Sequence, residues 1–171
     1  NQLVCSYLVE GVAHLALLDV DSLAFQPLNL PYTSIEAVLA APGEAFLIAA
    51  SATTGTALLR LDLSSGKVEV IRRASETGVN PAYVSAAQPI AFPTEAGLTA
   101  YGFYYPPANP DFMAPSGELP PLIVMSHGGP TAATSPGFRL SIQYWTTRGF
   151  AVLDVNYGGS TGFGRDYRER L

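Results

Sequence analysis

The sequence of 171 residues has few cysteines, histidines and charged side chains. Its single cysteine, Cys5, excludes a scaffold held together by disulfides within the chain. The two histidines, His14 and His127, lie far apart, and no CxxC or HxxxH spacing accompanies them. We therefore predict no metal site, because a protein zinc site needs several such ligands.

Charge is scarce, with an acidic excess. Charged residues make up 13% of the chain, the formal net charge is −5, and Lys67 is the only lysine. Proteins that bind nucleic acid need basic stripes, so nucleic acid is excluded as a partner, and so is an anionic membrane surface. No apolar run approaches the roughly 18 residues of a membrane-spanning helix.

The printed residues open on Asn1-Gln2-Leu3-Val4, without a lysine-rich apolar leader. This start suggests a piece of a longer polypeptide. We expect the protein to be cytoplasmic. A chain of this length has room for one ordinary domain or two small ones.

Short apolar segments separated by turns fill the first half of the chain, which predicts an all-β sandwich, barrel or propeller. Two of them, 15–22 and 58–65, resemble each other, and their aspartates Asp19 and Asp62 lie 43 residues apart. A period of about 40–45 residues is typical of four-stranded propeller blades, although a generic hairpin would also fit. We expect 35–72 to form one blade and roughly 3–30 the tail of another. The strands expected here are 15–20, 24–28, 35–39, 45–50, 56–63 and 67–71.

The second half has the sequence pattern of an α/β domain. A hairpin of strands 89–92 and 98–105 precedes a proline-rich loop at 106–121. Strands at 122–125 and 150–155 flank a helix that Ser135 and Pro136 are expected to begin and Gly149 to close. Strand, helix and strand predict a right-handed crossover between parallel strands. Asp154, inside the last apolar strand, is expected to make a structural hydrogen bond.

The first motif with a chemical interpretation is His127-Gly128-Gly129-Pro130, directly after an apolar strand. Active sites of open α/β sheets gather at this end of the strands, and two glycines let backbone N–H groups approach a ligand. An N–H aimed at a carbonyl oxygen stabilises a tetrahedral oxyanion. We interpret the run as an oxyanion-hole loop, with a plain Gly-Gly turn as the alternative, and His127 as a residue that shapes the loop.

The second motif, Gly158-Gly159-Ser160-Thr161-Gly162, matches the Gly-x-Ser-x-Gly pattern of hydrolase nucleophiles. We do not assign Ser160 as the nucleophile. It follows the strand next after His127, whereas the fold places the nucleophile one strand later, and no histidine follows it in the chain. We interpret the segment as a loop that lines the site.

Three stretches together resemble the prolyl oligopeptidase family of serine peptidases, in its acylaminoacyl-peptidase and dipeptidyl-aminopeptidase branch. They are 120–131, 143–152 and 156–165. The last matches the family pattern Asn-Tyr-Arg-Gly-Ser-Thr-Gly-Tyr-Gly, with Gly158 in place of the usual Arg and Phe163 in place of the second Tyr. The resemblance is specific over about residues 88–171.

The resemblance implies a mixed fold. The end of a β-propeller, about one and a half blades, would occupy 1–73, a connector 74–87, and the N-terminal portion of an α/β-hydrolase domain 88–171. The family implies a serine peptidase that hydrolyses short peptides, as an exopeptidase or an oligopeptidase, and it needs no cofactor. The backbone N–H of Gly129 would form half of the oxyanion hole. The residues on loops lining the site would be His127, Gly128, Tyr157 and Ser160.

In the family, the nucleophilic Ser, the Asp and the His all come later in the sequence than residue 171. We therefore expect a fragment without a catalytic triad, inactive alone, whose partners are the remainder of the same polypeptide and a peptide substrate. Two alternatives stay open. One is a non-catalytic protein of the same architecture that binds partners or acts as a scaffold, and the other is an esterase on this scaffold.

Overall fold

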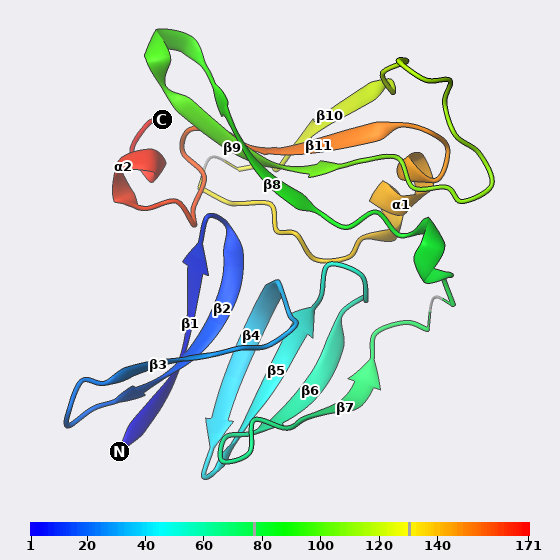
Figure 1. Cartoon of the computed structure of the whole chain (residues 1–171). Coiled ribbons are helices and arrows are strands. Elements are labelled where there is room, and N and C mark those ends of the chain that lie inside the picture. The colour runs from blue at the N-terminus through cyan, green and yellow to red at the C-terminus, as the bar shows by residue number, and fades with distance from the viewer. Residues whose placement is uncertain (77, 130) are drawn as a thin grey trace.

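The computed structural model describes residues 1–76, 78–129 and 131–171, which form three β-sheets and two short α-helices (Figure 1). The first sheet is antiparallel with the order β1-β2-β3. Its strands are β1 (Gln2–Val9), β2 (Val12–Asp19) and β3 (Phe25–Leu28). The sequence predicts β2 and β3 but no separate strand at β1.

The second sheet is a four-stranded antiparallel meander in the order β4-β5-β6-β7. Its strands are β4 (Ser34–Ala41), β5 (Glu44–Ala50), β6 (Ala57–Asp62) and β7 (Val68–Arg73). Along β6, buried and exposed positions alternate, as expected for a strand with one face in a core. The four-stranded unit predicted over 35–72 is confirmed.

The first two sheets share one hydrophobic core. Leu15 of β2 belongs to the same buried cluster as Leu47 of β5 and Leu59 of β6, and all three are 1% exposed or less. Burial of one leucine side chain is worth about 1.5–3 kcal/mol. The cluster therefore holds the two sheets against each other.

The third sheet has the order β10-β11-β9-β8. It lies on the opposite side of the molecule from the N-terminus (Figure 1). Its strands are β8 (Gln88–Pro93), β9 (Thr99–Tyr105), β10 (Leu122–Ser126) and β11 (Ala151–Asn156). β10 and β11 are parallel, while β9 is antiparallel to both of its neighbours. Helix α1 (Leu140–Thr146) connects the parallel pair, which confirms the predicted strand, helix and strand.

The predicted helix start at Ser135 and Pro136 is wrong, because α1 begins only at Leu140. The preceding segment passes between the third sheet and the other two (Figure 1). There the Phe138 amide donates a hydrogen bond to the Ser51 carbonyl at 2.8 Å. In a helix capped by Ser135, the Phe138 amide would bond to the serine side chain. Here it bonds just beyond β5 instead, so a tertiary contact overrides the local signal.

The turn between β1 and β2 contacts the loop that follows Ser160. The Gly11 amide donates to the Gly162 carbonyl at 3.3 Å. A Cβ on Gly11 would lie 2.9 Å from the Phe163 ring, and the φ of Gly11 is +77°. Both the close approach and the backbone angle require glycine here. The first sheet therefore supports this loop, which ends at helix α2 (Arg165–Arg168).

Candidate active site

Two loops meet at the carboxyl ends of the parallel strands β10 and β11. His127 directly follows β10, and Tyr157 directly follows β11. Their rings stack with centroids 4.4 Å apart and planes inclined by 20°, and the Tyr157 hydroxyl donates to the Gly129 carbonyl at 3.0 Å. Ligands of open α/β sheets bind at this end of the strands. The fold thus brings together the two loops that the sequence analysis singles out.

Ser160, the third polar residue of this cluster, is fully buried. Its hydroxyl donates to the Tyr157 carbonyl at 2.7 Å, and its oxygen lies 2.7 Å from Nε2 of His127. A serine hydroxyl has only one proton, so Nε2 of His127 carries the proton shared in the second contact. This network assigns the Nε2–H tautomer to the neutral ring. The Ser160 hydroxyl is committed to these two partners.

Replacing Ser160 by alanine leaves the Tyr157 carbonyl without its side-chain donor and the His127 ring without its acceptor. We expect the free energy of unfolding to fall by about 1–3 kcal/mol, the usual cost of leaving buried polar groups unpaired. Urea unfolding measures it. The matched control is Ser126→Ala, at an exposed position of β10, with an expected change within about 0.5 kcal/mol. Equal effects of the two variants would contradict the structural role of Ser160.

The glycine pair after His127 borders open space. Among the residues that the structure describes, and apart from its chain neighbours, a Cβ on Gly128 or on Gly129 would meet no atom within 4 Å. Gly129 has a φ of +70°, a left-handed conformation that L residues rarely adopt. The backbone at Gly129 is therefore accessible to a bound molecule and has a conformation specific to glycine.

A buried polar network fixes the far end of the same loop. The side chain of Asn156 accepts from the Thr134 amide at 2.8 Å and donates to the Thr134 carbonyl at 3.2 Å. The Thr134 hydroxyl donates to the Asp154 carboxylate, which also forms an ion pair with Arg139. Burial lowers the pKa of the Arg139 guanidinium, but its hydrogen bond with Asp154 and the charge of that carboxylate raise the pKa on balance. These contacts tie the loop after β10 to β11.

The sequence analysis predicts a structural hydrogen bond for Asp154, and the network confirms it. It does not predict the roles of Arg139, Thr134 and Asn156. A carboxylate inside an apolar strand signals that a cation must lie nearby, but the partner is set by the path of the chain before α1.

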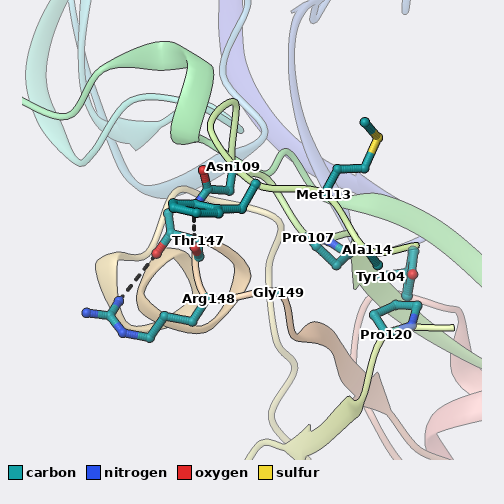
Figure 2. A pocket seen from close by; sticks show the side chains of 10 residues that line it. Tyr104, Pro107, Asn109, Met113, Ala114, Pro120, Thr147, Arg148 and Gly149 are labelled. Carbon is teal, nitrogen blue, oxygen red and sulfur yellow. Dashed lines mark hydrogen bonds between the residues drawn. The ribbon is translucent and has the colours of Figure 1, made fainter. Parts of the chain in front are cut away.

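A separate cavity of about 730 Å³ opens at the other end of the parallel strands (Figure 2). Pro120, just before β10, and Gly149, shortly before β11, both line it, together with Met113 of the proline-rich loop. His127 and Tyr157 follow the opposite ends of the same strands. The cavity is therefore distinct from the candidate site.

Within residues 1–76, 78–129 and 131–171, no group of three or more His, Cys, Asp or Glu side chains is arranged to hold a metal ion. In the same part of the chain, no helix has both the length and the apolar character needed to cross a membrane.

Known proteins similar to this chain are peptidases. Dipeptidyl aminopeptidase BIII of Pseudoxanthomonas mexicana is 51% identical over 47 residues, which is 28% of this chain and 7% of the relative. The acylamino-acid-releasing enzyme of Sus scrofa is 41% identical over 71 residues, which is 42% of this chain and 9% of that enzyme. The relatives of this chain are prolyl oligopeptidase family peptidases. No protein-family model matches the chain.

Solved structures extend the likeness to the prolyl oligopeptidase family over nearly the whole chain. A puromycin-hydrolyzing peptidase of Mycobacterium tuberculosis is 38% identical with a TM-score of 0.89, covering 95% of this chain and 25% of that one. A puromycin hydrolase mutant complexed with PGG, also 38% identical, has a TM-score of 0.88 and covers 98% and 26% of the two chains. The mostly β architecture is thus similar to propeller-containing peptidases of this family. The chain spans about a quarter of the length of these solved relatives.

Proposed function

We propose that this chain is part of a longer serine peptidase that hydrolyses short peptides. In this proposal residues 1–73 are the end of a β-propeller, 74–87 are a connector, and 88–171 are the N-terminal part of an α/β-hydrolase domain. The nucleophilic serine, its base and the orienting acid are supplied by the remainder of the polypeptide. The full-length protein below means this chain together with that remainder.

The observation that carries the proposal is the position of the glycine pair. Gly128 and Gly129 follow the carboxyl end of β10, and no described residue other than their chain neighbours would come within 4 Å of a Cβ on either. We assign the Gly129 N–H as one donor of an oxyanion hole, in which a peptide carbonyl gains negative charge as serine attacks it. One such donor lowers the barrier by about 3 kcal/mol. The puromycin hydrolase mutant complexed with PGG, a 38% identical relative, supports a peptide as the ligand.

The proposal gives this chain the oxyanion donor but no attacking group. Ser160 is fully buried and bonded to the Tyr157 carbonyl, so a nucleophile at this position would first have to break that bond. We therefore propose that the 171-residue chain has no peptidase activity by itself.

Fluorophosphonate labelling tests the proposal, because this reagent modifies serines that are activated for nucleophilic attack. We expect the full-length protein to be labelled at one serine beyond residue 171. Ser160→Ala should retain the label, and the 171-residue chain should take none. A full-length protein that is not labelled would favour the non-catalytic scaffold, and a label on Ser160 would reverse its assignment.

A further inference from the structure

We propose that Tyr157 is a positioning residue that fixes the direction of the Gly129 N–H. The inference rests on the proposed oxyanion role of Gly129. In this role the tyrosine hydroxyl contributes to catalysis without contacting the substrate.

The Tyr157 hydroxyl faces two carbonyls of the loop after β10. It lies 3.0 Å from the Gly129 carbonyl oxygen, 3.3 Å from the His127 carbonyl oxygen and 3.4 Å from Nδ1 of His127. The hydroxyl has one proton, and the Gly129 carbonyl is its shortest contact. The peptide unit that joins Gly128 to Gly129 carries the proposed donor N–H, and it lies between these two carbonyls in the chain. A hydroxyl bonded to the Gly129 carbonyl therefore fixes the backbone on one side of this peptide and limits its rotation.

Few other contacts limit this peptide. Glycine populates a wide range of backbone angles. In the part of the chain that the structure describes, a Cβ at Gly128 or Gly129 would meet nothing within 4 Å beyond its chain neighbours. Nδ1 of His127 lies 3.3 Å from the Gly128 carbonyl, but in the Nε2–H tautomer this nitrogen has no proton to donate. Electrostatic stabilisation of a transition state depends on donors that are already oriented, so the hydroxyl matters for the rate.

Tyr157 is itself held firmly. Its carbonyl accepts from the Ser160 amide at 3.0 Å and from the Ser160 hydroxyl at 2.7 Å. Its ring stacks on His127 at 4.4 Å, and His127 bonds to the same serine at 2.7 Å. The buried Ser160 thus anchors both the backbone of Tyr157 and the ring that Tyr157 packs against.

The test is Tyr157→Phe in the full-length protein, since it removes one oxygen and keeps the stacked ring. We expect kcat for a short chromogenic peptide to fall about tenfold, as for the loss of one hydrogen bond, with KM within about twofold. Affinity for a peptide boronic acid, which forms a tetrahedral adduct, should fall by the same factor as kcat. The control is Tyr144→Phe at an exposed position of α1, where the guanidinium of Arg148 lies 3.7 Å above the ring. This variant should change neither kcat nor the boronic acid affinity.

Hydrogen exchange of the peptide containing Gly129 gives a second readout that needs no turnover. We expect it to accelerate in Tyr157→Phe and not in Tyr144→Phe. If the wild-type protein is active and Tyr157→Phe has the same kcat and the same affinity for the boronic acid, this inference is overturned and the proposed function stands. A Tyr157→Phe variant that loses thermal stability or raises KM while kcat holds would also overturn it, because those changes indicate only a structural role. A wild type with neither label nor turnover would overturn the proposed function, and this inference with it.

Discussion

Replacing Gly129 by alanine in the full-length protein is expected to lower kcat about 100- to 1000-fold, the usual cost of losing one oxyanion donor. The φ of Gly129 is +70°, and an L residue in that conformation costs roughly 1–2 kcal/mol. Alanine therefore favours a negative φ and turns the N–H away from the site. The space beside the Cα is open, so the effect comes from backbone rotation and not from a clash.

The matched control is Gly43→Ala in the turn between β4 and β5. Gly43 has a φ of +77° and the same open surroundings, but it lies in the second sheet, away from the two loops. It should cost similar stability and leave kcat unchanged. If Gly129→Ala behaves in the same way, Gly129 has no part in catalysis.

Replacing Asp154 by alanine is expected to lower the free energy of unfolding by about 2–3 kcal/mol, because it leaves the buried Thr134 hydroxyl and the half-buried Arg139 guanidinium without their acceptor. Asp154 is 2% exposed, and it accepts from both Thr134 and Arg139. Chemical unfolding of the protein measures the change.

The control for Asp154 is an exposed ion pair. Arg165 and Glu169 lie 4.0 Å apart with their side chains 77% and 63% exposed, and such pairs are worth about 0–1 kcal/mol. Glu169→Gln should therefore change the unfolding free energy by less than about 1 kcal/mol. Asp154→Ala with an equally small effect would contradict the view that its network holds the loop after β10.

The second sheet could be predicted from sequence because its signals are local. Asp62 is the last residue of β6, and its side chain accepts from the amides of Ser64 and Ser65 at 3.0 and 2.8 Å. Asp19 accepts from the Ser22 amide at 2.7 Å in the corresponding turn of the first sheet. The repeat that pointed to propeller blades thus has a shared turn chemistry, since a short carboxylate bonds the backbone that follows it.

Other features depend on contacts between distant segments. β1 was not predicted because its residues are mostly exposed and alternate weakly. Ser135 and Pro136 are typical of a helix start, and this local signal predicts a helix there. In the structure the Phe138 amide bonds to Ser51 just beyond β5 instead. In the candidate site, the sequence identifies both loops, yet only the fold pairs Ser160 with His127.

A crystal structure of the full-length protein with a peptide boronic acid bound tests the central claim most directly. The account predicts a boron bonded to a serine beyond residue 171, with one boronate oxygen about 2.7–3.1 Å from the Gly129 nitrogen and the Tyr157 hydroxyl still on the Gly129 carbonyl. A boronate oxygen that points away from Gly129, or a boron bonded to Ser160, would contradict it.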